Sequence, residues 1–254
     1  MPEAVPAFVW VADLVAPGAS LLLDEAQSHH VARVCRARAG DLLSLTDGRG
    51  GVARGRVAKI APRVTLEIES TERSPRGSTA VLLCGAPEGQ RFDWLVEKLA
   101  ELGVARVRPI ECARRRWASV MVRPDRWRRL AIAALQQSRG RFLLEIESPV
   151  SLAAALELEV DRVLAVLADP AGVPPISVAL PGSGTTVGVV GPAGGFDQAE
   201  RSLIQGMGFR AMALSDGRLR TETAALAWAA WWAGGSVGAW EKNGPHLDDR
   251  QTRQ

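Results

Sequence analysis

Two different spacings of apolar residues divide the chain. Up to about residue 72, short apolar or alternating runs at 20–23, 42–45, 51–60 and 64–68 are separated by turn residues such as Asp47-Gly48 and Gly50-Gly51. Runs of this length, bounded by glycine-containing turns, predict β-strands joined by tight turns. We therefore expect residues 1–74 to form a small β-barrel or sandwich domain, with a polar linker at 71–78 at its end.

Beyond the linker the pattern changes to strands that alternate with amphipathic helices. Apolar runs at 80–84, 104–110, 163–167, 186–190 and 211–214 predict strands, and a helical spacing predicts helices over 92–102, 125–138 and 221–233. Asp197 and Glu200 have the spacing of a capping box and predict a further helix that Gly208 ends. Such alternation indicates an α/β domain with a largely parallel sheet. We assign it residues 75–240, and residues 241–254 to a polar tail.

Composition excludes several classes of protein. With 254 residues and 47% hydrophobic side chains, the chain resembles globular rather than disordered proteins. It has no run of 18 apolar residues and no signal peptide at its start, so we expect a cytoplasmic protein without a membrane partner. Three histidines and three scattered cysteines, Cys35, Cys84 and Cys112, argue against a disulfide framework and against a metal site. We expect the cysteines to be small buried hydrophobic residues.

Positive charge is concentrated in one segment, although the net charge is only +3. Residues 106–141 contain eleven arginines and only two acidic residues, Glu111 and Asp125. Arginine binds phosphate groups with two parallel hydrogen bonds and stacks on bases, so this density indicates an RNA or DNA partner. The alternative is a solvated helix face in a chain that uses arginine for most of its positive charges.

Three loops that follow predicted strands are candidates for a ligand site, because ligands of open α/β sheets bind beyond the carboxyl ends of the strands. They begin at Ala168, Gly191 and Ser215. The middle loop holds three glycines in five residues, which is typical of a backbone that turns tightly or approaches a ligand closely. The spacing excludes the dinucleotide-binding glycine fingerprint, and no phosphate-loop lysine is present. A purely structural turn remains the alternative.

The same loops carry a resemblance to a known family. Residues 191–196, G-P-A-G-G-F, and residues 218–224, R-L-R-T-E-T-A, resemble the GPEGG and LRTETA signatures of the bacterial ribosomal RNA small-subunit methyltransferase E family. Residues 88–109 resemble the family segment that ends K-x-x-E-L-G-V-x-x-I-x-P, and Gln136-Gln137-Ser138 stands where the family has EQS. Residues 29–36 resemble its N-terminal H-x-x-R-V-L-R. The resemblance thus spans about residues 28–233.

This resemblance implies a fold, a reaction and a set of partners. The fold is a small PUA-like β-barrel followed by a SPOUT-type α/β trefoil-knot methyltransferase domain, and the active form is a homodimer. The reaction is transfer of a methyl group from S-adenosylmethionine to N3 of a uridine in 16S ribosomal RNA, free or within the small ribosomal subunit. The residues expected to bind the cofactor are Leu167, Ala168, Gly191, Pro192, Gly194, Gly195, Leu214, Ser215, Leu219 and Thr223.

Three departures from the family pattern affect the expected site. Ala193 stands where GPEGG has its glutamate, which removes a carboxylate from that loop. Ser215-Asp216-Gly217 replaces the usual Gly-Pro-Arg, which changes the backbone freedom beside the adenosine pocket. Arg139-Gly140 stands where Gly-Arg is common.

Uracil N3 is a poor nucleophile until it loses its proton, so a group that favours the anion is needed. A guanidinium near the uracil oxygens would lower the pKa of N3, each unit being worth about 1.4 kcal/mol. Arg220 is our first candidate, and the alternative is an ion pair with Glu222 or with a neighbouring helix. Glu222 is a second candidate, as a general base, although a glutamate in a first helical turn is commonly a cap.

The remaining candidates concern RNA and packing. We expect RNA to be bound by Arg33, Arg36, Arg114, Arg115, Arg116 and Gln137. Trp117 is either a stacking face for a base or a core residue. Trp228, Trp231 and Trp232 indicate hydrophobic packing at a dimer interface rather than a platform for bases. Two rival functions remain: a catalytically silent RNA-binding factor in ribosome assembly, and a methyltransferase that acts on transfer RNA.

Overall fold

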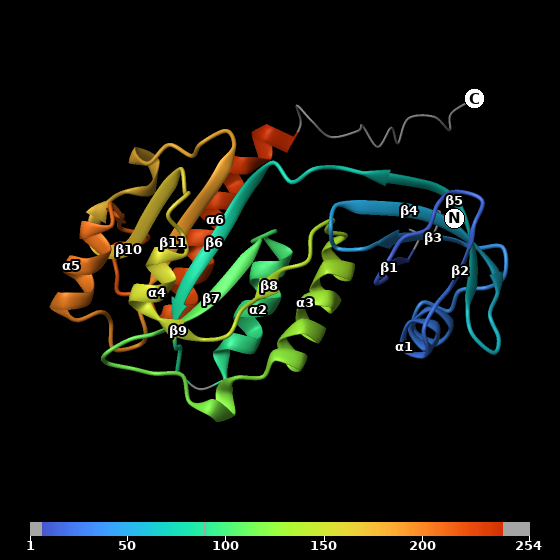
Figure 1. Cartoon of the computed structure of the whole chain (residues 1–254), viewed down its shortest axis with the longest axis horizontal. Helices are drawn as coiled ribbons and strands as arrows, with labels where there is room; N and C mark the ends of the chain where they lie inside the picture. Colours follow the sequence, from blue (N-terminus) through green and yellow to red (C-terminus); the bar gives the residue numbers. More distant parts are fainter. Residues whose placement is uncertain (1–6, 89, 241–254) are drawn as a thin grey trace.

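The computed structural model describes residues 7–88 and 90–240, and these form two separate β-sheets with six α-helices (Figure 1). The expected polar tail at 241–254 lies outside the described residues. None of the helices in the described ranges has the length and apolarity that a membrane span requires.

The first sheet has five strands in the order β1-β3-β4-β5-β2. Its strands are β1 (Phe8–Trp10), β2 (Ser20–Leu22), β3 (Leu42–Thr46), β4 (Gly51–Lys59) and β5 (Thr65–Arg73). All pairs are antiparallel except β1 with β3. Strand β4 alternates buried and exposed side chains, as expected for a sheet with one face on a core. Its inward residues join Val9, Leu45 and Leu66 in one apolar cluster.

A short helix covers part of this sheet and was not predicted from the sequence. Helix α1 (Glu25–His29) continues into a π-helical turn, η1 (His30–Val34). Asp24 begins it with a capping box, because its carboxylate accepts the backbone N–H of Gln27 while the Gln27 side chain accepts that of Asp24.

The second sheet is entirely parallel, as the alternation of strands and helices predicted. Its order is β12-β10-β11-β6-β7-β8, and β9 also pairs with β7. The strands are β6 (Ser78–Gly85), β7 (Arg106–Glu111), β8 (Glu145–Ile146), β9 (Val150–Ser151), β10 (Leu164–Val173), β11 (Gly184–Val190) and β12 (Arg210–Met212).

Helices cover both faces of the parallel sheet and give it three layers (Figure 1). On one face lie α2 (Arg91–Glu101), α3 (Pro124–Ser138) and α6 (Thr221–Trp240); on the other lie α4 (Leu152–Glu157) and α5 (Gln198–Gly206). Alternate residues of β6 point to the two faces: Leu82 joins the first core and Leu83 the second. The capping box that the sequence predicted for α5 is present between Asp197 and Glu200.

The two sheets are held together by contacts of the first with helix α3 and the segment after it. The side-chain oxygen of Gln136 accepts the backbone N–H of Trp10 at 2.9 Å, and the Arg128 guanidinium lies over the Trp10 ring. Arg141 donates to Glu72 at 2.6 Å. The expected linker at 71–78 is shorter than predicted, because residues 71–73 continue β5, where they pair with residues 51–53 of β4.

Candidate functional site

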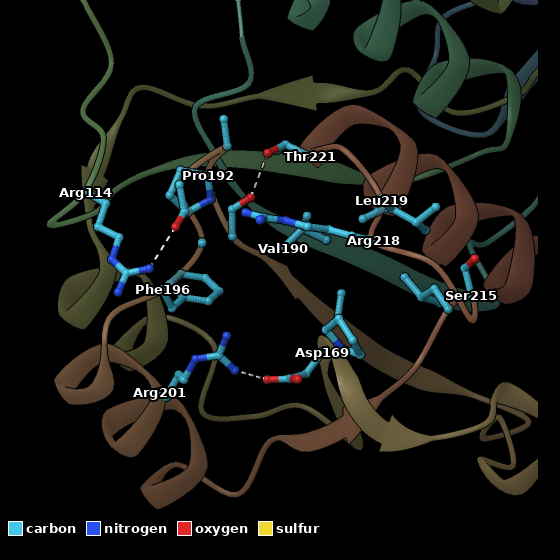
Figure 2. A pocket seen from close by; sticks show the side chains of 18 of the residues that line it. Arg114, Asp169, Val190, Pro192, Phe196, Arg201, Ser215, Arg218, Leu219 and Thr221 are labelled. Atoms are coloured by element: carbon cyan, nitrogen blue, oxygen red, sulfur yellow. Dashed lines mark hydrogen bonds and ion pairs between the residues drawn. The ribbon is translucent and has the colours of Figure 1, made fainter.

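A cavity of about 420 Å³ lies where the three candidate loops meet (Figure 2). Strand β10 pairs in parallel with both β11 and β12, so the carboxyl ends of these three strands lie at one edge of the sheet. The expected first loop, with Ala168, Asp169 and Pro170, is an irregular part of β10, where the register with β12 shifts after Ala168. The other two loops contribute residues 191–196 and 214–219 except Asp216. The volume is in the range of small-molecule sites.

The glycine-rich turn forms one wall, and contacts on both sides hold it in place. Gly195 adopts a φ of +69°, and its N–H donates to Pro192 O at 2.7 Å. Thr221 Oγ1, at the start of α6, donates to Gly191 O at 3.0 Å. A Cβ on Gly191 would lie 3.2 Å from the Phe196 ring. Close packing therefore favours glycine at position 191, and the left-handed backbone favours it at position 195.

Charged side chains also line this cavity. Arg114 donates to Gly194 O at 2.9 Å. Arg201, from α5, forms an ion pair with Asp169, and Figure 2 shows this pair bordering the cavity. Leu214, Leu219 and Ala224 supply apolar surface. The cavity thus combines apolar walls with a charged region.

A second cavity, of about 340 Å³, adjoins the first. It is lined by Glu88, Ala193, Arg218, Leu219, Arg220, Thr221 and Glu222. Four of these residues, Ala193, Arg218, Leu219 and Thr221, also line the first cavity. Two molecules bound in the two cavities would therefore be in contact or nearly so.

Both candidate catalytic residues, Arg220 and Glu222, line this second cavity. The Glu222 side chain is only 8% exposed and pairs with Arg91 of α2, whose side chain is 41% exposed. The partner considered for Arg220 is therefore occupied elsewhere. Arg220 itself is exposed, and no ion pair of its guanidinium is found within the described residues.

Eight of the ten residues expected to bind the cofactor line the first cavity. They are Ala168, Gly191, Pro192, Gly194, Gly195, Leu214, Ser215 and Leu219. Leu167 is buried in the sheet directly before the cavity, at 1% exposure. Thr223 is exposed on the first turn of α6 and does not line either cavity.

The residues expected to bind RNA lie at several places. Arg33 and Arg36 are exposed beside the π-helical turn, where Arg36 has a φ of +54°. Arg116 and Gln137 are exposed, whereas Arg115 is half-buried. Arg114 is exposed but lines the first cavity, so its position serves that site as well.

Part of the arginine-rich segment maintains the fold instead of facing a partner. Arg108 is 5% exposed and pairs with Glu147 and Glu159, and Arg106 pairs with the same two carboxylates. Arg126 pairs with Asp93 at 2.6 Å. The arginine density of residues 106–141 therefore does not correspond to one free basic surface, because Arg106, Arg108 and Arg126 pair with acidic residues from other parts of the chain.

The tryptophans are mainly core residues. Trp117 is 7% exposed and packs edge-on against Phe92 and Trp127, so it offers no stacking face. Trp228 and Trp232 are buried within the chain itself, at 0% and 6% exposure. This packing needs no dimer interface.

The cysteines lie mainly in the interior. Cys84 and Cys112 are buried, and burial raises the pKa of both thiols, that of Cys112 to about 12. Cys35 is half-buried. Among the described residues, no group of three or more His, Cys, Asp or Glu side chains is arranged to hold a metal ion.

Sequence reasoning assigned no role to four charged residues in or beside the two cavities. Arg218 lines both of them, Arg91 holds Glu222, and Asp169 and Arg201 pair beside the first. Asp169 lies in a loop that the sequence did single out. Arg218 and Arg91 lie in segments 218–224 and 88–109, which carry the family resemblance, but their roles were not predicted. Arg201 has no signal in the sequence, because its role depends on which elements are neighbours in space.

Comparison with known proteins agrees with this architecture. Residues 74–233 match the RNA methyltransferase domain, and residues 23–69 match the RNA methyltransferase PUA domain. The chain is 27% identical to ribosomal RNA small subunit methyltransferase E of Synechocystis sp. over 212 residues, which cover 81% of this chain and 70% of that protein. It is 34% identical to the protein of that name from Aquifex aeolicus over 138 residues, 53% of this chain and 59% of the relative.

A solved structure is also similar. It is the ribosomal RNA small subunit methyltransferase E of Neisseria gonorrhoeae bound to S-adenosyl methionine. The TM-score is 0.79 at 25% identity, and the match covers 89% of this chain and 96% of that chain.

Proposed function

Because this chain belongs to the RNA methyltransferase family, we propose that it transfers a methyl group from S-adenosylmethionine to N3 of a uridine in 16S ribosomal RNA. The expected fold class, a SPOUT-type α/β knot domain after a small PUA-like domain, is confirmed by the structural match and by the PUA match. The resemblance that the sequence carried is confirmed as well. The observation that carries the proposal is the pair of adjoining cavities at the ends of β10, β11 and β12.

The first cavity suits S-adenosylmethionine on the evidence of its own walls. A Cβ on Gly85 would lie 2.3 Å from Pro192 N, so the glycine-rich turn is packed tightly from behind. Leu214, Leu219 and Ala168 offer apolar surface to an adenine ring, and the turn offers backbone groups to its polar edges. When bound, the cofactor supplies a methyl group activated by its positively charged sulfur. Leu167 and Thr223 remain proposed members of this site.

The second cavity is the proposed place of the uracil. Arg220 would hold its guanidinium near the uracil oxygens and so lower the pKa of N3, which favours the anion. Glu222 is a second candidate, as the acceptor of the N3 proton. Its ion pair with Arg91 holds the carboxylate at the wall of this cavity. Positioning of the two molecules accounts for the rest of the rate.

The target base must leave its RNA stack, which costs a few kcal/mol. We propose that exposed arginines recover this cost through phosphate contacts, Arg116 on the α/β domain and Arg33 and Arg36 on the first domain. Arg114, Arg115 and Gln137 complete the proposed RNA surface. The first domain, residues 1–74, would bind RNA, and residues 75–240 would carry the reaction, with activity in the cytoplasm where ribosomes assemble.

A homodimer is part of the proposal. Trp94 on α2 is 45% exposed, and Trp231 on α6 is half-buried, so both leave apolar surface for a second copy. Light scattering after size-exclusion chromatography should give twice the 27.1 kDa mass of the chain. A single-chain mass at micromolar concentration would contradict the dimer.

Donor binding and methyl transfer test the function directly. We expect calorimetry to show binding of S-adenosylmethionine. When small subunits from cells that lack the gene are incubated with the protein and this donor, mass spectrometry should show one new methyluridine in their 16S ribosomal RNA. Binding of ribosomal RNA without any heat from the donor would favour the silent assembly factor. Methylation of transfer RNA instead would favour the other rival.

A further inference from the structure

Asp169 and Arg201 form a charged pair on the lining of the first cavity, and neither residue has a role in the reaction proposed above. Asp169 follows the core of β10, and Arg201 lies in the first half of α5. Their side chains are 10% and 38% exposed. Asp169 Oδ1 accepts the N–H of Ala171 at 3.0 Å, while Oδ2 faces the Arg201 guanidinium. Figure 2 shows both side chains at the border of the cavity.

Helix α5 does not need this pair in order to begin. Its N-terminus is already capped by Asp197, whose carboxylate accepts the N–H of Glu200 at 2.8 Å. The Glu200 side chain in turn accepts the N–H of Asp197 at 2.9 Å and that of Ala113 at 2.7 Å. The start of α5 is therefore held by these hydrogen bonds without the Asp169–Arg201 pair.

Both partners retain capacity for a ligand. A guanidinium has five N–H donors, and an ionised carboxylate has about four acceptor positions. Within the described residues, Arg201 uses its side chain on Asp169 alone, and Asp169 accepts from Ala171 and Arg201 alone. A bound molecule with one negative and one positive group could therefore extend the pair into a ring of four alternating charges.

The proposed donor has such an end. Its adenosyl part is largely apolar and suits the wall of Leu214 and Leu219, whereas its methionine part carries an α-carboxylate and an α-ammonium group. We propose that Arg201 binds the α-carboxylate and Asp169 the α-ammonium of the donor. This assignment rests on the proposed function and deepens it, because it states which part of the cavity binds the methionine part of the donor.

Three ligands separate this assignment from the function itself. S-adenosylmethionine and S-adenosylhomocysteine carry the amino acid, whereas 5′-methylthioadenosine keeps the adenosyl thioether and lacks it. In calorimetry, Arg201→Gln and Asp169→Asn should each weaken the binding of S-adenosylmethionine and S-adenosylhomocysteine by roughly 10- to 100-fold. This is the range for hydrogen bonds to charged groups. Affinity for 5′-methylthioadenosine should stay within about twofold. Arg210→Gln, an exposed arginine on β12, is the matched control and should change none of the three.

The swap Asp169→Arg with Arg201→Asp adds a structural control. It keeps an ion pair between the two positions but reverses its direction, so it should restore thermal stability without restoring S-adenosylhomocysteine binding. Equal weakening of all three ligands by the single variants would overturn the assignment, as would unchanged affinities. If the unaltered protein bound 5′-methylthioadenosine as tightly as S-adenosylhomocysteine, the amino acid would contribute nothing to affinity and only this assignment would fail. If it bound none of the three, the proposed function would fail first.

Discussion

The carboxylate of Glu222, in the first turn of α6, is paired with the guanidinium of Arg91, in the first turn of α2. The two residues are 131 positions apart. The Glu222 side chain is almost completely buried, whereas that of Arg91 is 41% exposed. The ion pair therefore holds the Glu222 carboxylate at the wall of the second cavity. Its other partner, Arg91, belongs to α2, a helix that sequence reasoning had not connected with the site.

Replacing Glu222 by glutamine tests its role in proton transfer. If Glu222 accepts the N3 proton, Glu222→Gln should lower kcat by roughly 10²- to 10⁴-fold, because the amide cannot act as a base. The donor Kd should be unchanged, since Glu222 does not line the first cavity. Single-turnover methyl transfer and calorimetry measure the two quantities. Glu97→Gln changes a partly exposed residue of α2 that lines neither cavity, and it serves as the control. A kcat within about twofold for Glu222→Gln would exclude the general base.

Replacing Arg220 by alanine tests the stabilisation of the uracil anion. Without the guanidinium, the pKa of N3 should rise, so less anion should be present at neutral pH. We expect kcat to fall by about 10²-fold or more at pH 7 and the loss to shrink as pH rises, because bulk deprotonation then replaces the missing charge. A pH–rate profile of the variant against the unaltered protein measures this. A loss that is constant across pH would mean that Arg220 positions RNA and does not act on N3.

The main helices and strands of the α/β domain could be predicted because the spacing of apolar residues and the residues that end each element match the faces that are buried in the structure. The helix expected over 92–102 is observed as Arg91–Glu101, and Gly103 follows it with a φ of +74°. The three site loops could be found because the carboxyl ends of parallel strands share one edge of the sheet. Helix α1 was not predicted because five residues are too few for a helical period to be recognised.

The pairing of side chains within the site could not be predicted. Asp169 and Arg201 meet because β10 lies between β11 and β12, and no local pattern specifies that order. The same applies to Arg108, whose partners Glu147 and Glu159 lie 39 and 51 positions later. The density of arginines along the chain therefore overestimated the number that are free to bind a partner, because composition does not show ion pairs between distant parts of the sequence.

The salt dependence of RNA binding tests which arginines face the RNA. Arg116→Ala, combined with Arg33→Ala and Arg36→Ala, should weaken binding and reduce the slope of log K against log salt by roughly 0.7 to 0.9 for each lost phosphate contact. All three side chains are exposed. Donor affinity should not change. Arg114→Ala should weaken donor binding as well, because it removes the hydrogen bond to Gly194 O.

Filter binding over a salt series and calorimetry with the donor measure the two effects. Arg108→Ala is unsuitable as a control, because it would leave Glu147 and Glu159 without their buried cation. Arg210→Gln on β12 is suitable, since its side chain is exposed at the edge of the sheet. An unchanged slope for the triple variant would mean that the RNA lies on another face.

Gly188 tests the packing of the last helix on the sheet. A Cβ at this position in β11 would lie 2.2 Å from Trp228 Cε2, and Trp228 is completely buried in α6. Gly188→Ala should therefore lower the free energy of unfolding by about 1–3 kcal/mol, the usual cost of overpacking. Gly206→Ala, with nothing within 4 Å of its Cβ, should be neutral or slightly stabilising. Urea denaturation compares the two, and equal midpoints would contradict the packing.

Asp47 should make stability depend on pH. Burial by itself would raise the pKa of Asp47, but hydrogen bonds from Arg49 N, Gly51 N and the Arg73 guanidinium outweigh burial and hold the pKa below its usual value. A lowered folded-state pKa gives stability that is present above the unfolded value of about 3.9 and is lost as pH falls through the folded value.

Asp47→Asn should accordingly be less stable than the unaltered protein at pH 7, by about 1–3 kcal/mol. The difference should begin to shrink as pH falls below about 4, because the aspartate of the unfolded chain is then protonated. It should disappear once pH has fallen through the lower folded-state pKa, where the folded aspartate loses its charge-assisted hydrogen bonds as well. Urea denaturation between pH 3 and pH 7 measures the effect. Asp161→Asn, an exposed aspartate before β10, should leave the pH dependence unchanged. A stability difference that persists at low pH would show that the amide at this position disturbs packing and that charge is not the cause.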